Sequence, residues 1–197
     1  MRLIKLPILF ILMIIVSACS GSGGFKADHK YEVPAFEFTN QNGESVSLDD
    51  LKGTVWLAQF VFTNCATVCP PMMMNMAQIE EDLHKAGVED YKIVSFSVDP
   101  KVDTPEKLKN YLEMFNVKDE NRWEMLTGFT QEEIGELAMK SFKTVVADIP
   151  DSDQVLHGTT FALVNQEGQV VKLYSGNVDV PFEQIEKDVK ALIKAGA

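Results

Sequence analysis

The pattern of apolar and polar residues along the chain predicts six strands. Short segments that alternate in this way are typical of strands with one solvated face, and Asn42-Gly43 between the first two favours a hairpin turn. Longer runs of apolar and β-branched residues are typical of strands buried on both faces. On these grounds we expect strands at 36–38, 45–48, 54–62, 91–98, 159–165 and 169–174, with the last two forming a second hairpin.

Helix signals lie between and after these strands. Pro70-Pro71 suits the first turn of a helix, and Gly87 suits its end. Asp103 or Thr104 can cap a further helix, and 130–133 has the form of a capping box. We expect helices from 70 to about 86, from 103 to about 115, from 130 to about 142 and from 181 to about 194.

The order of these elements predicts a layered α/β domain with a partly parallel sheet, because strands and helices alternate through its middle. In such sheets the functional groups gather at the C-terminal ends of the parallel strands, where loops lead into helices. Residues 31–197 are enough for one domain of ordinary size, and neither a repeat nor a second linker divides them.

The first 18 residues have the anatomy of a signal peptide. Two basic residues precede the apolar stretch 6–16, which is shorter than the roughly 20 residues that a membrane-spanning helix needs. Small residues then lead to Cys19, an ending that resembles the lipobox of bacterial lipoproteins. We therefore expect a signal peptide at 1–18, a lipid on Cys19 and a flexible tether over 19–30; ordinary cleavage and an uncleaved anchor are the alternatives.

The chain is strongly acidic. Its formal charge is −11, and loss of Arg2 and Lys5 with the leader takes this to −13. Such a surface repels nucleic acid and anionic lipid, so we expect no nucleic-acid partner and a membrane attachment that depends on the lipid. Export would place the protein at the cell membrane, on the extracytoplasmic face, where disulfides form and persist.

Two further cysteines, Cys65 and Cys69, directly follow the strand expected at 54–62. A strand-to-helix loop is a common place for functional residues. Thiols four residues apart can close a disulfide or bind one soft ion, and the adjacent helix N-terminus favours the thiolate. A redox-active pair, a metal site and a buried structural disulfide therefore all remain open. A structural zinc site is disfavoured, because such sites are closed by four protein ligands.

His157 is the candidate third member of this site. It lies just before the strand expected at 159–165, and Gly158 would allow a close backbone approach. A single histidine in this position is often a surface residue, but the strand-end position together with a thiol pair favours a ligand role. Two thiolates and one imidazole with an open position suit a transferable soft metal or a redox reaction.

Two neighbouring motifs each have a structural interpretation. Methionines fill four of the five positions 72–76, and their thioethers could bind Cu(I), although such residues are more often helix core. They cannot all face one side, so we expect at least one to be exposed. Asp99 and Asp103 follow the strand at 91–98, and we expect a turn and a helix cap from them.

Three motifs together resemble the Sco/SenC family. They are the cysteine-bearing segment 62–70, the segment 97–105 and the segment 157–161, and the likeness runs in order over 36–192. Members of this family are membrane-anchored, thioredoxin-like proteins that assist copper-site assembly in cytochrome c oxidase. The resemblance implies a thioredoxin-like fold with the first hairpin as an N-terminal extension.

The resemblance also implies a ligand set and a client. Cys65, Cys69 and His157 would bind copper, as Cu(I) or Cu(II), and oxidation of the two cysteines to a disulfide would abolish the site. The client would be the dinuclear copper site of cytochrome c oxidase subunit II, to which the protein delivers copper or which it prepares.

The competing hypothesis is a thiol-disulfide oxidoreductase, so the sequence leaves open whether the chain is an enzyme. Cys65 would attack and Cys69 would resolve the mixed disulfide, either to reduce the subunit II cysteines or as an extracytoplasmic redox sensor served by a thiol-reducing partner protein. Three residues separate the cysteines, where the usual redox motif has two, which disfavours a general thioredoxin-type reductase. A peroxidase is weaker still, since the Thr-x-x-Cys pattern of thioredoxin-like peroxidases is missing around Cys65.

Overall fold

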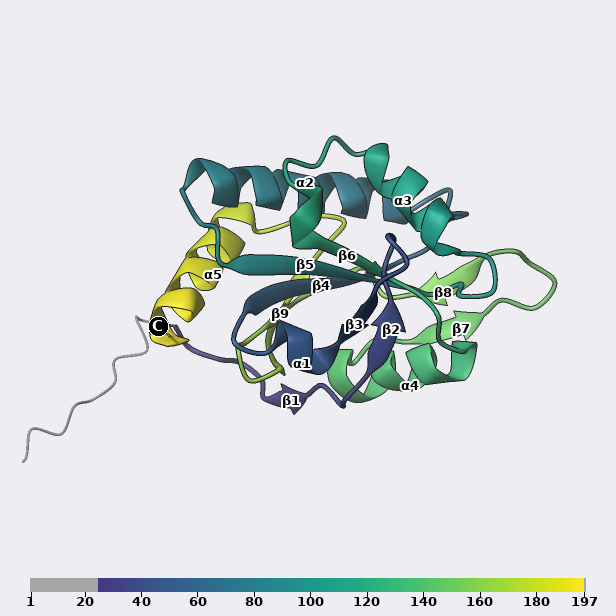
Figure 1. Ribbon diagram of the computed structural model, residues 1–197, viewed down its shortest axis with the longest axis horizontal. Coiled ribbons are helices and arrows are strands. Elements are labelled where there is room, and N and C mark those ends of the chain that lie inside the picture. The colour runs from purple at the N-terminus through teal and green to yellow at the C-terminus, as the bar shows by residue number, and fades with distance from the viewer. Residues whose placement is uncertain (1–24, 197) are drawn as a thin grey trace, which may run out of the picture.

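A mixed sheet of six strands forms the centre of the protein (Figure 1). The computed structural model describes residues 25–196. In spatial order the strands are β1 (Tyr31–Glu32), β10 (Gln169–Ser175), β9 (Thr160–Val164), β4 (Val55–Val61), β5 (Tyr91–Ser97) and β6 (Trp123–Leu126). β4, β5 and β6 run parallel, whereas β9, β10 and β1 extend the sheet through antiparallel pairings. The predicted α/β class and partly parallel sheet are confirmed.

Two hairpins lie outside this sheet. β2 (Glu37–Thr39) pairs with β3 (Ser45–Ser47), as predicted, and an isolated bridge joins Thr39 to Thr127 just after β6. β7 (Val146–Asp148) pairs with β8 (Val155–His157) and projects from one end of the molecule (Figure 1).

The sequence prediction missed β1, β6, β7 and β8. Each has two to four residues, which is too short for a period-2 pattern to stand out. β6 is a strand because it pairs in parallel with β5, and β7 exists because it pairs with β8. These partners come from distant or irregular parts of the chain, so local patterns could not reveal them.

The four predicted helices are present, together with two short ones. A capping box of Thr130 and Glu133 starts α4, as expected. Thr104, and not Asp103, caps α3. The helices are α1 (Leu48–Leu51), α2 (Cys69–Lys85), α3 (Pro105–Glu113), α4 (Gln131–Phe142) and α5 (Phe182–Gly196), and a 3-10 turn covers Glu120–Arg122.

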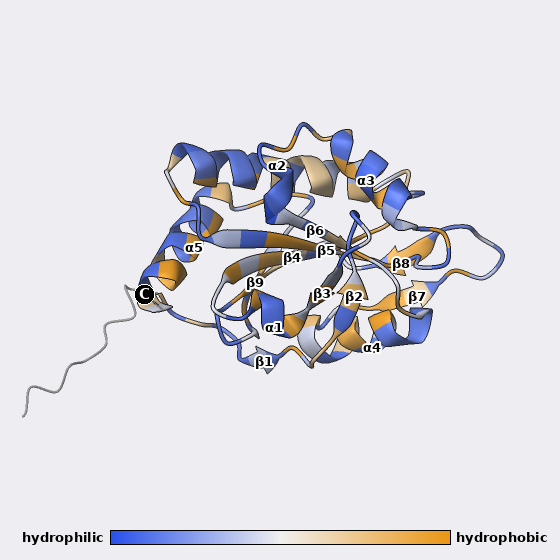
Figure 2. Cartoon of the chain, viewed as in Figure 1, coloured by the Kyte–Doolittle hydropathy of each residue, from blue (hydrophilic) through white to orange (hydrophobic). Residues whose placement is uncertain are grey.

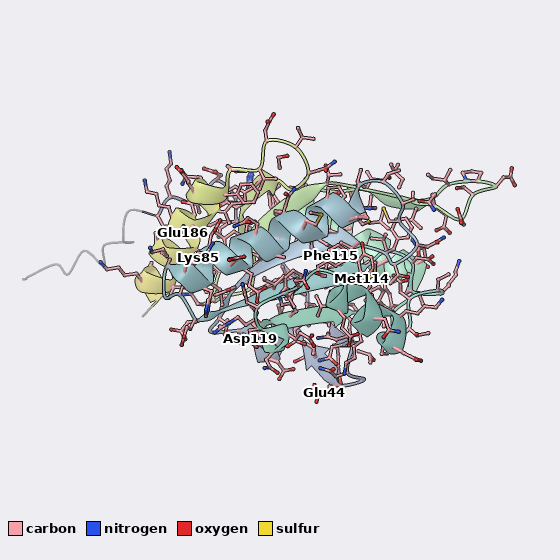
Figure 3. The ribbon with its side chains drawn as sticks, turned by 90° about the horizontal axis from the view of Figure 1, so that it is seen from above. Glu44, Lys85, Met114, Phe115, Asp119 and Glu186 are labelled. Atoms are coloured by element: carbon pink, nitrogen blue, oxygen red, sulfur yellow. The ribbon has the colours of Figure 1, made fainter. Side chains whose placement is uncertain are left out.

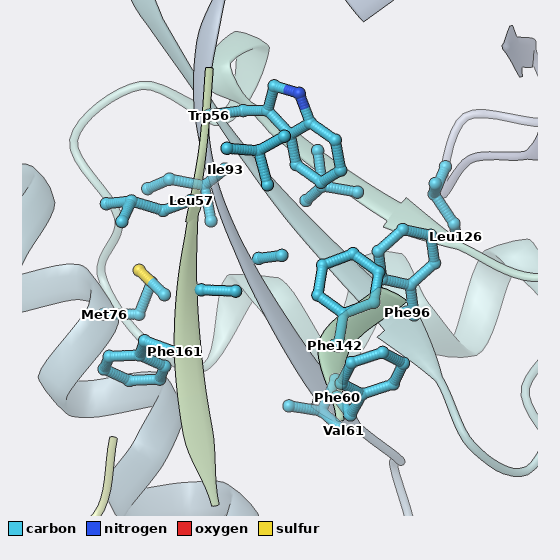
Figure 4. Packing of buried hydrophobic residues seen from close by; sticks show 14 of the residues in the cluster. Trp56, Leu57, Phe60, Val61, Met76, Ile93, Phe96, Leu126, Phe142 and Phe161 are labelled. Atoms are coloured by element: carbon cyan, nitrogen blue, oxygen red, sulfur yellow. The ribbon is translucent and has the colours of Figure 1, made fainter. Parts of the chain in front are cut away.

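Helices cover both faces of the sheet, and each covered face has its own core. Figure 3 shows α2 and α5 next to each other, with Lys85 and Glu186 labelled. On the face toward α4, neighbouring aromatic rings have centroids 5.2–6.5 Å apart. Figure 4 shows this group, which consists of Trp56, Phe60, Phe96 and Phe142, separate from Met76 and Phe161. The large apolar residues of β4 and β5 thus anchor these two strands in the core, and the loops toward α2 and α3 start from the ends of these strands.

The whole predicted leader, Cys19 and the predicted tether up to residue 24 lie outside the described residues. Asp28 and His29, at the end of the predicted tether, donate backbone hydrogen bonds to the carbonyl of Val171 in β10. Within residues 25–196, none of the helices has both the length and the apolar character needed to cross a bilayer.

Candidate metal and thiol site

The two cysteines lie where the sequence predicts them, between β4 and α2. Cys65 follows the end of β4 by four residues, and its N–H donates to the carbonyl of Phe62 at 3.3 Å, which turns the chain. Cys69 is the first residue of α2, and Pro70-Pro71 fills the first turn, where the missing N–H groups cost no helical hydrogen bond.

The thiols and the imidazole of His157 converge. One ligand atom from each of the three residues lies within 4.8 Å of the other two. The Sγ of Cys69 is 3.2 Å from Nε2 of His157, and the N–H of Cys69 donates to the Sγ of Cys65 at 3.3 Å. Both cysteines are free thiols. Among residues 25–196, no other group of three Cys, His, Asp or Glu side chains brings its ligand atoms together in this way.

The ring of His157 is oriented by its own neighbourhood. Nδ1 lies 3.0 Å from the carbonyl oxygen of Gly158, which requires the proton on Nδ1 and leaves the lone pair of Nε2 directed at Cys69. Phe62 packs edge-on against the ring, with centroids 5.7 Å apart. A hydrogen bond from the distal nitrogen to a carbonyl is the usual way to orient a metal-binding histidine.

The hairpin that carries His157 is held against the cysteine-bearing loop. The side chain of Asn64 donates to Asp153 at 2.9 Å, and the side chain of Gln154 donates to the carbonyl of Asn64 at 3.1 Å. A Cβ on Gly158 would lie 1.9 Å from Oγ1 of Thr144, so the close approach expected at this glycine is present. His157 lies before the core strand β9, as expected, and it ends β8, a short strand that the sequence did not predict.

The two thiols differ in pKa. Burial raises the pKa of Cys65, but hydrogen bonds from the Cys69 thiol and from the N–H groups of Cys69, Thr67 and Val68 outweigh this effect and lower it. Burial strongly raises the pKa of Cys69, and its role as donor to Cys65 and the charges of Cys65 and Asp103 add to the rise. Cys65 is therefore the thiol that ionises first.

His157 is neutral at pH 7. Burial lowers its pKa, and the hydrogen bond to Gly158 offsets only part of this shift. A neutral imidazole whose Nε2 carries a lone pair can bind a metal ion.

The geometry fits one soft ion. With the bond lengths known for zinc, about 2.3 Å to sulfur and 2.0 Å to nitrogen, a sulfur and a nitrogen on one ion lie at most about 4.3 Å apart. The 3.2 Å between Sγ of Cys69 and Nε2 of His157 is within this limit. The three ligand atoms lie within 4.8 Å of one another, which is close to the roughly 4.6 Å that separates two sulfurs on opposite sides of one ion. Two thiolates with one imidazole suit copper or zinc.

A cavity of about 370 Å³ opens next to Cys65 and His157. Apolar side chains form much of its wall, among them Phe62, Val68, Ile149 and Leu156. Figure 2 shows the hydrophobic character of β8 at this edge of the molecule. A cavity of about 520 Å³ at the opposite ends of the parallel strands includes neither cysteine nor histidine among its described lining residues. The convergent ligand group therefore lies at the C-terminal ends of the parallel strands.

The neighbouring motifs have mainly structural places. Met72, Met73 and Met76 are fully buried, whereas Met74 is 64% exposed, as expected for at least one of the four. Asp99 is partly buried beside the site, and burial raises its pKa, with further contributions from the charges of Asp103 and Asp148. Asp99 does not belong to the convergent ligand group.

Sequence reasoning missed the polar residues around the thiol loop. Asp103, expected to form a cap, is instead buried with Thr63 and Ser97 as partners. The hydroxyl of Tyr111 is buried without a partner among the described residues, and burial, then the charges of Cys69, Cys65 and Asp103, raise its pKa. One sequence signal could have indicated this role of Asp103. Asp103 follows the core strand β5, and β5 runs parallel to β4, so the segments after the two strands lie at the same edge of the sheet.

Comparison with known proteins identifies the family. The SCO1/SenC family matches residues 26–194. The chain belongs to this family. The SCO1 protein homolog of Bacillus subtilis (strain 168) is 44% identical over 191 residues, which cover 97% of both chains.

Solved structures agree with this assignment. A SCO1/SenC family lipoprotein from Bacillus anthracis str. Ames has a TM-score of 0.79 and 44% identity over 83% of this chain and 95% of its own. BsSco is a member of the Sco family of cytochrome c oxidase assembly proteins in which a disulfide switch has been identified. Its structure has a TM-score of 0.77 and 43% identity over 87% of this chain and 96% of its own. Bradyrhizobium japonicum ScoI with copper bound has a TM-score of 0.68 and 27% identity over 82% and 99%. The expected thioredoxin-like fold is confirmed.

Proposed function

We propose that this protein binds copper through Cys65, Cys69 and His157 and serves in the assembly of cytochrome c oxidase. The observation that carries the proposal is the convergence of two free thiols and an imidazole within 4.8 Å. Thiolates and imidazole together suit copper, and Cu(I) tolerates the low coordination number that three ligands provide. The copper-bound structure of Bradyrhizobium ScoI supports copper over zinc.

The cysteine pair acts as a redox switch in this proposal. Oxidation joins the two sulfurs in a disulfide and releases two protons and two electrons. One disulfide of a partner can accept both the electrons and the protons, or two Cu(II) ions can accept the electrons while the protons pass to solvent. The disulfide leaves only His157 as a ligand, so oxidation ends copper binding. The disulfide switch described for BsSco supports this step.

The proposed client is the dinuclear copper site of cytochrome c oxidase subunit II. A site built from three ligands, with an apolar cavity beside it, leaves room for an incoming ligand from the client. The test is to mix the copper-loaded protein with the reduced, copper-free domain of subunit II and to follow the absorption of the dinuclear centre. Development of that absorption is expected; copper that stays with the donor contradicts delivery.

The protein is proposed to reach its client from a lipid anchor on Cys19. The description of the Bacillus anthracis relative as a lipoprotein supports this, and an extracytoplasmic position follows from the leader. Mass spectrometry of the mature N-terminus tests it. A diacylglycerol on Cys19 is expected, and an unmodified Cys19 thiol contradicts the anchor.

The copper site is tested on the reduced full-length protein in detergent. His157→Ala, Cys65→Ala and Cys69→Ala should each weaken copper binding at least tenfold, or about 1.4 kcal/mol. His84→Ala is the matched control, because His84 is exposed on α2 and outside the ligand group. Equal copper affinity in all five proteins would contradict the three-ligand site.

A second candidate function is thiol-disulfide exchange with the cysteines of subunit II. Cys65 is 7% exposed and lines the cavity, whereas Cys69 is fully buried, as suits an attacking and a resolving thiol. Reduction of a client disulfide would leave the Cys65–Cys69 disulfide, which a thiol-reducing partner protein then reopens. The test is steady-state disulfide reduction without copper. Sustained turnover by His157→Ala favours the oxidoreductase, and its absence in the wild type argues against it.

A further inference from the structure

Asp103 is a buried carboxylate in the turn between β5 and α3. Its side chain is only 1% exposed. Thr104 provides the cap of α3 by accepting the N–H of Lys107 at 3.3 Å, so the helix does not use Asp103 as its cap. The carboxylate is directed instead into the protein, toward the loop that carries the cysteines.

Four hydrogen bonds join Asp103 to the ends of three parallel strands. The carboxylate accepts the N–H of Thr63 at 3.2 Å and its hydroxyl at 2.6 Å, beyond the end of β4. It also accepts the hydroxyl of Ser97, the last residue of β5, at 2.6 Å. Its backbone carbonyl accepts the hydroxyl of Thr127, next to β6, at 2.8 Å.

All of these partners are neutral. Within residues 25–196, no Lys, Arg or His nitrogen lies within ion-pair distance of Asp103. Asp188, also buried, has Lys172 at 2.9 Å as its counter-ion. Burial of an unpaired carboxylate costs free energy unless donors satisfy it, so the three donors on Asp103 must remain in place. Their geometry is therefore strongly constrained.

We propose that Asp103 is a positioning residue for the thiol pair and that Asp103 acts through its hydrogen bonds to Thr63. Thr63 lies two residues before Cys65, while Cys69 is held separately by the start of α2. A displacement of Thr63 therefore moves the sulfur of Cys65 relative to the other two ligand atoms. The inference rests on the proposed function for its copper readout, whereas the dithiol-disulfide equilibrium tests it without metal.

Thr63 offers the sharpest pair of variants. Thr63→Val keeps the branched shape and loses the hydroxyl donor, whereas Thr63→Ser keeps the donor. Residues that orient metal ligands typically change affinity about 10- to 100-fold when they are altered. We expect Thr63→Val to weaken copper binding about tenfold and to change the dithiol-disulfide equilibrium constant about tenfold, or about 30 mV. Thr63→Ser should remain within about threefold of the wild type.

Asp103 itself is tested by two substitutions. Asp103→Asn keeps the size of the side chain and one acceptor oxygen, but it replaces the other acceptor oxygen with an NH₂ group that cannot accept a hydrogen bond. We therefore expect an intermediate change in copper binding and in the dithiol-disulfide equilibrium. Asp103→Ala should change both at least as much as Thr63→Val. If Asp103→Ala fails to fold, the comparison of Thr63→Val with Thr63→Ser decides the question.

Glu80→Gln is the matched control. Glu80 is likewise 1% exposed, and its carboxylate accepts the N–H groups of Lys118 and Asp119 at 3.0 and 2.9 Å. It lies eleven residues after Cys69 on α2, or roughly 16 Å along the helix. We expect Glu80→Gln to lower the free energy of unfolding while both equilibria stay within about threefold of the wild type.

Two results would overturn the role of Asp103. One is that Thr63→Val and Asp103→Asn both leave copper affinity and the dithiol-disulfide equilibrium within threefold of the wild type. The other is that Glu80→Gln or Thr63→Ser changes them as much as Thr63→Val does. A wild type without copper affinity would refute the proposed function alone, since the metal-free equilibrium would still report on Asp103.

Discussion

The thiols and the imidazole are held by two very different parts of the molecule. Cys69 starts a helix of 17 residues whose inner face, with Met72, Met73 and Met76, is fully buried. His157 ends a strand of three residues in a two-stranded sheet, and its neighbour Leu156 is 54% exposed. The main core therefore fixes one half of the site, and a few local contacts fix the other half.

This difference separates stability from ligand geometry. Changes under α2 should unfold the protein, because they remove apolar contacts of the main core. Changes in the β7–β8 hairpin should move His157 with a smaller loss of stability, because few buried apolar groups hold that hairpin. The site can thus be dissected by its two supports.

The largest expected effect is on the helix side. Met76→Ala should lower the free energy of unfolding by roughly 2–5 kcal/mol, since Met76 is fully buried against the sheet. Met74→Ala on the same helix should change it by less than about 0.5 kcal/mol, because Met74 is exposed. Urea unfolding of the reduced protein measures both. Equal losses in the two variants would contradict the assigned face of α2.

The next effect concerns the close approach of the hairpin to Thr144. Gly158→Ala places a methyl group 1.9 Å from Oγ1 of Thr144, so the hairpin must shift. We expect a loss of roughly 1–3 kcal/mol in stability together with weaker copper binding. Urea unfolding and copper titration measure the two effects.

Two variants sharpen this prediction. Thr144→Ala removes the clashing hydroxyl, so Gly158→Ala should cost less stability in that background than in the wild type. Gly135→Ala in α4 is the control, because its methyl group would meet only the carbonyl of Val146 at an ordinary 3.6 Å. That variant should be neutral or slightly stabilising. Additive losses for Gly158→Ala and Thr144→Ala would argue against the contact.

A smaller effect is the pH dependence contributed by His157. Burial holds its pKa in the folded protein below the value near 6.5 expected in the unfolded chain. The unfolded chain therefore binds more protons at mildly acidic pH, so this contribution to stability is present above about pH 6.5. It is lost progressively as the pH falls from about 6.5 through the lower pKa of the folded protein.

Comparison of variants isolates that contribution. His157→Gln should show a shallower fall in the free energy of unfolding between about pH 7.5 and 5.5 than the metal-free wild type does. His84→Gln, which alters an exposed histidine, should keep the wild-type slope. Identical slopes in all three proteins would show that His157 is not buried as described.

The smallest effect is expected at the exposed edge of the hairpin. Leu156→Ala should change the free energy of unfolding by about 0.5 kcal/mol or less, since this side chain is 54% exposed. Copper affinity should also stay close to that of the wild type, because His157 keeps its contacts with Gly158 and Phe62. A large loss of stability in this variant would remove the contrast between the two supports.

Local patterns predicted the long elements of the fold well and the short ones poorly. β4 and β5 each contain seven buried or nearly buried residues, and α4 carries a complete capping box. Each of these elements can therefore be predicted from its own segment of sequence. β6 and the β7–β8 hairpin depend on pairing with other segments. Short segments of this kind have too few residues for a periodic signal.

The candidate site was predicted through its residue types and its place at a strand end. Cys65, Cys69 and His157 are three chemically distinctive residues, and the structure brings them together. Asp103 was misjudged as a cap, because a carboxylate before a helix has a local role available. Its actual partners, Thr63 and Ser97, reach it only when β4 and β5 lie side by side.

The class of fold, the strand-to-helix position of the thiols and the identity of the three candidate ligands could all be predicted from the sequence. These depend on periodicity, on helix signals and on residue chemistry, all of which act within a few neighbouring positions. The folded structure was needed to find the hairpin that carries His157, the differing pKa shifts of the two thiols and the buried partners of Asp103. These depend on burial and on hydrogen bonds between segments far apart in the chain, which exist only once the sheet has formed.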